Sequence, residues 1–264
     1  MVSSGRKYFV PYITAGFPCK NEFLKYLNLL CEYGDMVEIG IPFSDPLADG
    51  SDLQIAHEMS LRQKVDIDFV FSSIANLRVK KPLIIMSYLN PILAYGIEKF
   101  LRKAKERNVI GLVIPDMPFE EARFFLPVFE QYKIFYIPFA TVSTSPERFL
   151  DIEKVASLFI YFVSVKGTTG GRDELPEYTY HKLKELRNLT NKKLFLGFGV
   201  KKPQSIKKLL HLIDGVIIGS EIARRILNQE NIEEFMKEHL NLLKRGDKDA
   251  RRLVDKRSKG SNNH

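Results

Sequence analysis

The sequence predicts a parallel (β/α)8 barrel, and three observations support this prediction. Eight short apolar runs alternate with amphipathic stretches, which is the order of elements in a parallel α/β protein. The chain has 264 residues, close to the roughly 250 residues of a single α/β barrel. No linker rich in Pro, Gly or Ser divides residues 8–243. We therefore expect one TIM-barrel domain over residues 1–243 and a poorly ordered basic tail over residues 244–264.

Eight strands are predicted from near-continuous runs of Val, Ile, Leu, Phe and Tyr. Such runs are typical of strands in a parallel sheet, because helices cover both faces of the sheet. The predicted strands are residues 8–13, 36–41, 83–88, 110–114, 134–139, 158–163, 194–198 and 215–218.

Amphipathic patterns between these runs predict the helices. The helix that begins at Pro146 has a typical start, with Ser145 as its cap and Glu147 in its first turn. Asp52, just before another helical pattern, is predicted to be an N-cap. The predicted helices are residues 21–33, 53–63, 66–79, 97–107, 120–132, 146–155, 178–189, 203–212, 220–227 and about 232–243.

The alternative architecture is an open, doubly wound sheet. That fold commonly carries a GxGxxG turn after its first strand. The first turn here is Thr14-Ala-Gly-Phe-Pro18, which lacks that pattern, so we favour the closed barrel.

The composition excludes several other classes of protein. Apolar residues make up 45% and charged residues 27%, which rules out collagen-like, low-complexity and wholly disordered chains. Cys19 and Cys31 provide neither a disulfide framework nor a zinc-binding CxxC pair, so we expect a reducing, cytoplasmic setting. No apolar run approaches the ~18 residues of a membrane helix, and the N-terminus lacks the apolar core of a signal peptide. We expect no membrane partner.

The net charge of +8 is concentrated near the C-terminus. Residues 244–260 hold eight basic and three acidic side chains, so this tail carries +5 of the total. One interpretation is an arm that binds nucleic acid, and the other, which we favour, is a solvated helix end. The rest of the chain lacks a basic stripe interleaved with aromatic residues, so we expect no nucleic-acid partner.

The segment 36–50 carries the strongest catalytic candidate. Active sites of α/β barrels lie at the carboxyl ends of the strands and in the loops that follow them. Strand alternation places Glu38 inside the barrel and its neighbours Val37 and Ile39 outside. A carboxylate there is costly unless it has a cationic partner or a raised pKa suited to acid–base chemistry. No basic residue stands at a neighbouring strand end, so we favour acid–base chemistry over a buried ion pair.

The loop after Glu38 holds three more polar candidates: Ser44, Asp45 and Asp49. The two aspartates begin Asp-Pro and Asp-Gly dipeptides, which are typical of turns. Each of them taken alone is therefore more often a turn residue than a catalyst.

Small residues after the last three predicted strands indicate a phosphate site. Gly170 lies in a loop rich in glycine and threonine that is suited to cover a ligand. Gly199 follows the seventh strand, and Gly219 and Ser220 follow the eighth and open a helix. In α/β barrels these positions frequently bind phosphate through backbone amides at a helix N-terminus. Ser220 can also be a plain N-cap, and the two roles are compatible.

The five histidines carry no catalytic prediction. His57, His181, His211 and His239 fall within helical patterns, and His264 is terminal. None stands at metal-ligand spacing from a cysteine or a carboxylate, so we expect no metal site.

Seven short motifs lie in order along about residues 8–230. The most specific is VEIGIPFSDPLADG at residues 37–50. The others are YITAGFP at 12–18, MSYLNP at 86–91, PDMP at 115–118, GTTG at 167–170, GFG at 197–199 and GS at 219–220. Together they resemble the pattern of the tryptophan synthase alpha chain family.

This resemblance implies a (β/α)8-barrel lyase of L-tryptophan biosynthesis. The family cleaves indole-3-glycerol phosphate to indole and glyceraldehyde 3-phosphate by a retro-aldol reaction. The resemblance implies no cofactor in this chain, and it implies a partner, the beta chain, that uses pyridoxal phosphate. In the α2β2 complex, indole passes to the beta chain through a tunnel.

The resemblance also implies roles for individual residues. The family's acid–base glutamate falls on Glu38, its catalytic aspartate on Asp49, and an aspartate near the beta interface on Asp116. Phosphate contacts fall on Gly170, Gly199, Gly219 and Ser220. Positions that line the indole pocket fall on Tyr12, Met86, Tyr88, Tyr161 and Phe198.

Three features depart from the family pattern. Ser51 stands where proline is usual, Val165 stands where many members carry arginine, and the helix that commonly precedes the first strand is missing or vestigial. We further expect the loop 166–172 to close over the loop 42–50 when substrate binds, with Thr169 contacting Asp49.

Two alternatives stay open. A free-standing lyase would release indole instead of channelling it. A weakly active relative would serve mainly as an allosteric partner of a beta chain, although intact Glu38 and Asp49 argue against that interpretation.

Overall fold

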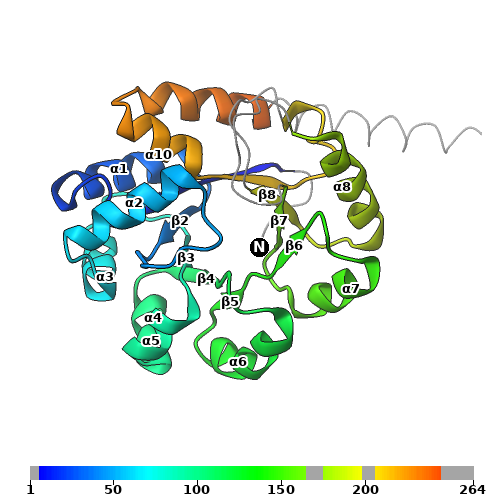
Figure 1. The fold of residues 1–264 in the computed structure, drawn as a ribbon, viewed down its shortest axis with the longest axis horizontal. Coiled ribbons are helices and arrows are strands. Elements are labelled where there is room, and N and C mark those ends of the chain that lie inside the picture. The colour runs from blue at the N-terminus through cyan, green and yellow to red at the C-terminus, as the bar shows by residue number, and fades with distance from the viewer. Residues whose placement is uncertain (1–5, 165–174, 198–205, 245–264) are drawn as a thin grey trace, which may run out of the picture.

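The structure is a ring of parallel strands surrounded by helices (Figure 1). The computed structural model describes residues 6–164, 175–197 and 206–244. Strands form the inner wall and the helices lie outside it, so the chain adopts the predicted single-domain (β/α)8 barrel. Of the predicted basic tail, only Lys244 lies within the described residues.

The strands of the described residues form one sheet. Its order is β5-β4-β3-β2-β1-β9-β8-β7-β6, and every neighbouring pair is parallel. The strands are β1 Tyr8–Thr14, β2 Val37–Gly40, β3 Leu83–Met86, β4 Val109–Val113, β5 Phe135–Tyr136, β6 Phe139–Thr141, β7 Ile160–Val163, β8 Leu194–Gly197 and β9 Gly215–Ile218.

β5 and β6 are two halves of one barrel strand, and together they close the ring. β5 pairs with β4 on one side, and β6 pairs with β7 on the other. Between them, Ile137 N donates to Leu112 O at 2.9 Å, and Tyr161 N donates to Pro138 O at 2.9 Å. Pro138 has no N–H to donate, so the predicted continuous strand 134–139 is divided at this residue.

The helices lie outside the strand ring and alternate with the strands along most of the chain (Figure 1). They are α1 Lys20–Tyr33, α2 Ser51–Arg62, α3 Ile67–Ala75, α4 Leu89–Tyr95, α5 Ile97–Glu106, α6 Phe119–Gln131, α7 Pro146–Val155, α8 Glu177–Leu189 and α10 Ser220–Leu227. A further helix covers residues 232–244.

Several helix ends differ from the prediction for local reasons. α2 begins at Ser51 with Gly50 as its N-cap, so the prediction that Asp52 is a cap was wrong. The cap of α3 is Asp66, whose side chain accepts from Phe69 N. Ser145 caps α7 as predicted, since its side chain accepts from Arg148 N.

The sequence analysis missed α4 altogether. Pro91 is its third residue, and a proline suppresses a helical prediction. It is tolerated there because the first N–H groups of a helix have no partner within the helix. The predicted helix 203–212 is described only from residue 206, and residues 208–212 form turns.

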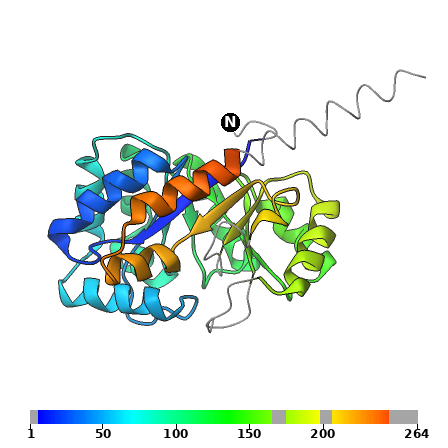
Figure 2. The ribbon, with the colours of Figure 1, turned by 90° about the horizontal axis from the view of Figure 1, so that it is seen from above.

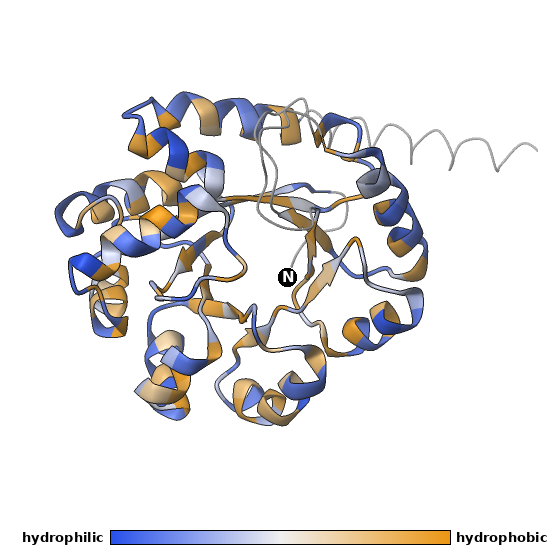
Figure 3. Ribbon diagram, viewed as in Figure 1, coloured by the Kyte–Doolittle hydropathy of each residue, from blue (hydrophilic) through white to orange (hydrophobic). Residues whose placement is uncertain are grey.

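Aromatic side chains fill the barrel near the N-terminal ends of its strands. The ring of Phe195 stacks on Phe159 with centroids 4.0 Å apart, and on Tyr8 at 5.7 Å. Gly215 leaves room for these rings, because a Cβ at that position would lie 2.9 Å from the ring of Phe195. Apolar residues dominate the strands, and the blue, hydrophilic residues are concentrated on the helices (Figure 3).

The helix of residues 232–244 runs alongside β1 (Figure 2). Its His239 stacks on Phe9 with ring centroids 6.1 Å apart. Before β1, Arg6 pairs with Asp35, and Lys7 Nζ donates to Ile213 O at 2.5 Å. The first five residues, where a short N-terminal helix would lie, are outside the described residues. None of the described helices is long and apolar enough to cross a membrane.

Candidate active site

Glu38 lies on β2 and is only 1% exposed to solvent. Neither carboxylate oxygen has a hydrogen-bond partner among the described residues. An inward carboxylate without a cationic partner was predicted from the sequence, and none of the described residues forms an ion pair with Glu38. Burial, and to a smaller extent the negative charge of Asp49, raise the pKa of Glu38 to about 8. The side chain is therefore a neutral acid near pH 7.

Asp49 lies in the loop between β2 and α2, and it is also buried. Its Oδ2 accepts a hydrogen bond from Tyr88 Oη at 3.2 Å, and Tyr88 Oη in turn accepts from Ala48 N at 2.9 Å. Oδ1 has no partner in the described ranges. Burial raises the pKa of Asp49 to about 6, and the Tyr88 hydrogen bond opposes that rise. Asp49 is therefore mostly ionised near pH 7, unlike Glu38.

Ser44 and Asp45 do not join this pair. Both are exposed, and Ser44 Oγ donates to Asp45 Oδ2 at 2.6 Å. The turn interpretation holds for Asp45, whose carbonyl accepts from Leu47 N at 2.9 Å. Asp49 also closes a backbone turn, since its N–H donates to Pro46 O at 3.1 Å, but its side chain is buried.

His57 is a site residue that sequence reasoning missed. It lies on α2 and is buried, and its Nδ1 accepts from Phe43 N at 3.0 Å. Its Nε2 lies 3.5 Å from Asp49 Oδ2. Burial lowers the pKa of His57 to about 4, so the ring is neutral.

A signal for His57 was present in the sequence. Leu53, Ala56, His57 and Ser60 are the buried residues of α2, and their spacing defines one helix face. The sequence analysis examined the histidines only as metal ligands, and no group of three or more potential metal-binding side chains occurs in the described parts of the chain.

Four of the five predicted indole-pocket residues gather around the two carboxyls. Tyr12 and Tyr161 come from β1 and β7, and both are buried in a position where the charges of Glu38 and Asp49 act on them. Burial, the largest cause, raises the pKa of both tyrosines well above its usual value. Met86 and Tyr88 are buried at the end of β3 and just before α4.

Two glycines make room for these rings. A Cβ on Gly40 would lie 2.0 Å from Tyr12 Oη, and a Cβ on Gly197 would lie 2.1 Å from the ring of Tyr161. Both distances are far below van der Waals contact, so only glycine allows the two tyrosines to occupy the barrel mouth. The fifth residue, Phe198, lies outside the described residues.

The predicted phosphate residues are described only in part. Gly219 is the N-cap of α10 and Ser220 is its first helical residue, so the alternative of Ser220 as a plain N-cap was wrong. A Cβ on Gly219 would lie 2.8 Å from the ring of Tyr12, which places this helix end beside the pocket. Gly170, Gly199 and the loop residue Thr169 lie outside the described residues.

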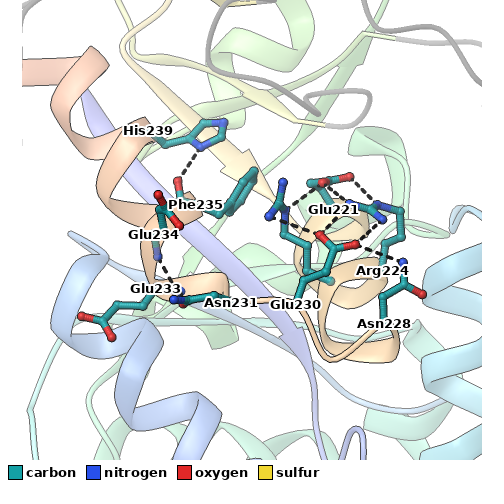
Figure 4. Close-up of polar contacts among 10 residues, drawn as sticks. Glu221, Arg224, Asn228, Glu230, Asn231, Glu233, Glu234, Phe235 and His239 are labelled. Atoms are coloured by element: carbon teal, nitrogen blue, oxygen red, sulfur yellow. Dashed lines mark hydrogen bonds and ion pairs between the residues drawn. The ribbon is translucent and has the colours of Figure 1, made fainter.

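An ion-pair cluster joins the first turn of α10 to its last turn and to Glu230 just after it (Figure 4). Glu221, in the first turn of α10, is 7% exposed and accepts hydrogen bonds from Arg224 at 2.8 and 2.9 Å. Arg225 Nε also donates to Glu221, at 2.9 Å, and Arg224 donates to Glu230 at 2.8 Å. The two arginines neutralise an acidic charge that would otherwise oppose an anion at this helix N-terminus.

Asp116 has a clear local role. Its carboxylate accepts from Leu89 N at 2.9 and 3.2 Å, so it caps the start of α4 and orders the segment that carries Tyr88. The side chain is exposed, and its predicted place at a partner interface stays a prediction.

Comparison with known proteins adds independent evidence. The profile of the family described as "Tryptophan synthase alpha chain" matches residues 1–252. The tryptophan synthase alpha chain of Caldicellulosiruptor bescii is 38% identical over 241 residues, covering 91% of this chain and 94% of the relative. That of Thermococcus kodakarensis is 36% identical, covering 86% and 92%.

A solved structure shares the fold. A chain of the tryptophan synthase α2β2 complex of Pyrococcus furiosus superposes with a TM-score of 0.83 at 33% identity. The match covers 92% of this chain and 99% of that one.

Proposed function

The chain belongs to the tryptophan synthase alpha chain family, and we propose that it is the lyase that cleaves indole-3-glycerol phosphate to indole and glyceraldehyde 3-phosphate. The observation that carries this proposal is the pair of buried carboxyls, Glu38 and Asp49, in one aromatic-lined barrel mouth. Two carboxyls whose environments separate their pKa values are suited to divide acid and base roles between them.

Glu38 is the proposed acid and then the base. With a pKa of about 8, roughly nine in ten Glu38 side chains carry a proton at pH 7. In the first step, that proton moves to carbon 3 of the indole ring, and positive charge develops at the ring nitrogen. The Glu38 carboxylate then takes the proton of the side-chain hydroxyl. The carbon–carbon bond breaks, its electron pair returns to the ring, and the hydroxyl carbon becomes an aldehyde.

Asp49 is the proposed acceptor for the indole N–H. With a pKa of about 6, it is mostly ionised at neutral pH, which suits a group that stabilises positive charge at the ring nitrogen. Its Oδ1 has no hydrogen-bond partner among the described residues, so this oxygen is available to the ring. Tyr12, Met86, Tyr88 and Tyr161 supply apolar surface for a flat bicyclic ring. We propose the same role for Phe198.

The substrate phosphate is proposed to bind at the start of α10. Gly219 and Ser220 present backbone amides at a helix N-terminus, and no side chain of Gly219 blocks them. The neutralised Glu221 permits an anion there. We propose Gly170 and Gly199 as further phosphate contacts.

The proposed partner is a beta chain in an α2β2 complex. The tryptophan synthase of Pyrococcus furiosus forms such a complex and shows mutual activation. Pyridoxal phosphate is expected only in that partner. Closure of loop 166–172, with Thr169 contacting Asp49, is the proposed route by which the partner raises the rate. Both cysteines are free, which supports a cytoplasmic location.

An indole-release assay on the purified chain tests the proposal. We expect indole and glyceraldehyde 3-phosphate in equal amounts, slowly from the chain alone and faster with a beta chain. Equal rates with and without a beta chain would favour a free-standing lyase. Release only in the presence of a beta chain would favour the allosteric-partner interpretation. No cleavage under either condition would contradict the lyase assignment.

A further inference from the structure

His57 bridges the two ends of the loop that carries Asp49. On one side, its Nδ1 accepts the backbone N–H of Phe43, near the start of the loop, at 3.0 Å. On the other side, its Nε2 lies 3.5 Å from Asp49 Oδ2, near the end of the loop. Since α2 begins immediately after the loop, one buried ring on this helix reaches both ends.

The proton of the neutral ring is assigned by these contacts. A nitrogen that accepts a hydrogen bond carries no proton, so Nδ1 is bare and Nε2 carries the hydrogen. Burial keeps the pKa of His57 at about 4, so this tautomer persists throughout the neutral range. The Nε2–H therefore faces a carboxylate oxygen, and the contact places a neutral donor, and not a second charge, beside the carboxylate.

The separation of 3.5 Å is slightly longer than a normal N–H···O bond. Nε2 has no hydrogen-bond partner in the described ranges, and a shift of a few tenths of an ångström toward Asp49 would satisfy it. Catalytic hydrogen bonds are often long before substrate binds and shorten afterwards.

The consequence for Asp49 is an asymmetric carboxylate. Tyr88, just before α4, and His57 on α2 both approach Oδ2 and leave Oδ1 without a described partner. One oxygen contacts protein groups, and the other has no hydrogen-bond partner among the described residues.

We propose that His57 is a positioning residue that donates its Nε2–H to Asp49 Oδ2, and thereby orients Oδ1 toward the indole N–H and keeps the carboxylate ionised. This inference rests on the proposed function. It adds a residue to which the sequence analysis gave no role.

Two matched substitutions separate this role from simple anchoring of the loop. His57→Asn keeps an acceptor near the position of Nδ1 and loses the reach to Asp49. His57→Gln places an amide donor near the position of Nε2 and loses the Phe43 contact. His239→Gln is the control, because His239 is equally buried and neutral but stacks on Phe9 and Phe235. Its Nδ1 lies 2.9 Å from Phe235 O (Figure 4).

The pH profile of kcat/KM is the readout. Loss of a donor to the carboxylate raises its pKa. We therefore expect His57→Asn to move the acidic limb, near pH 6 in the wild type, upward by about one unit, and to lower kcat/KM at pH 6 about fivefold. His57→Gln and His239→Gln should leave the limb within a few tenths of a unit. The other titratable groups that face Asp49 are Glu38, Tyr12, Tyr88 and Tyr161, and none has a pKa near 6.

A second measurement keeps the two proposals distinguishable. Carbon-13 NMR titration of the Asp49 carboxyl reports its pKa without any turnover. An unchanged Asp49 pKa in His57→Asn, or a larger shift in His57→Gln than in His57→Asn, would overturn the role of His57. Absence of indole release by the wild type would overturn the proposed function alone.

Discussion

Two buried glutamates of the barrel have opposite surroundings. Glu38 on β2 is 1% exposed, and neither of its oxygens has a described partner. Glu221 on α10 is 7% exposed, and both of its oxygens accept from arginines. The two side chains are almost equally buried, so their hydrogen-bond partners, and not their exposure, distinguish Glu38 from Glu221.

The difference separates a side of the site built for chemistry from a side built for binding. A buried carboxyl without partners is costly in its charged form, so its pKa rises and it holds a proton that it can donate. A buried carboxylate with two cationic partners keeps its charge and fixes the backbone around it. The proposed phosphate contacts are accordingly backbone groups beside Glu221, whereas the proposed acid is the side chain of Glu38 itself.

The largest expected effect is on turnover, and the same substitution at both glutamates measures it. Glu38→Gln preserves shape but removes the acid, so kcat should fall by about 10²–10⁴-fold. Glu221→Gln lies outside the proposed chemistry, so its kcat should stay within about threefold of wild type under saturating substrate. Steady-state indole release checks both. Retention of more than about a tenth of wild-type kcat by Glu38→Gln would remove this residue from the mechanism.

The next effect is on substrate binding at the start of α10. Gly219→Asp introduces bulk and a like charge at the helix N-terminus, and like-charge contacts cost several kcal/mol. We expect affinity for glycerol phosphate to fall about 10²-fold by calorimetry. Gly219→Asn has the same shape without the charge, so its smaller loss measures the bulk alone. Unchanged affinity in Gly219→Asp would place the phosphate elsewhere.

The third effect is on the pH dependence of stability. The pKa of Glu38 is raised in the folded chain, so the folded state keeps this proton to higher pH than the unfolded state. Its contribution to stability is fully present below the unfolded pKa and is lost as the pH rises through about 8.

Between pH 6.5 and 9, this group should therefore lower the free energy of unfolding by about 2 kcal/mol. Urea unfolding of wild type and Glu38→Gln across this range isolates the effect, because every other titrating group is common to both proteins. Parallel curves for the two proteins would show that Glu38 does not titrate in this range.

The smallest effect is on stability at neutral pH on the other side of the site. Glu221→Gln removes the charge that pairs with Arg224 and Arg225, both of which are partly exposed, so we expect a loss of about 1 kcal/mol. Glu230→Gln is the control, because Glu230 is more exposed and its loss should be smaller. A gain in stability in Glu221→Gln would contradict the division between the two sides, since a gain is the result expected of Glu38→Gln at pH 9.

Much of the fold was predictable because its signals are local. Each strand of a covered parallel sheet is a short apolar run, and the predicted bounds lie within a few residues of the observed ones for seven of the eight strands. The exception is residues 134–141, where Pro138 divides the strand into β5 and β6. Only the pairing of β5 with β4 and of β6 with β7 shows that the two halves occupy one strand position of the barrel. α4 was missed for a related reason, since Pro91 lowers helix propensity but is harmless in a first turn.

The sequence by itself determined the inward direction of Glu38, because side chains alternate along a strand, and it determined the place of the site, because parallel strands end at one mouth. It also carried motifs specific enough to identify the family. Only the tertiary structure decided that the side chain of Asp49 is buried, that Glu38 has no partner among the described residues, and that His57 reaches Asp49. The physical reason is that burial and hydrogen bonding depend on contacts between side chains of distant segments. Neither the spacing nor the composition of the sequence specifies those contacts.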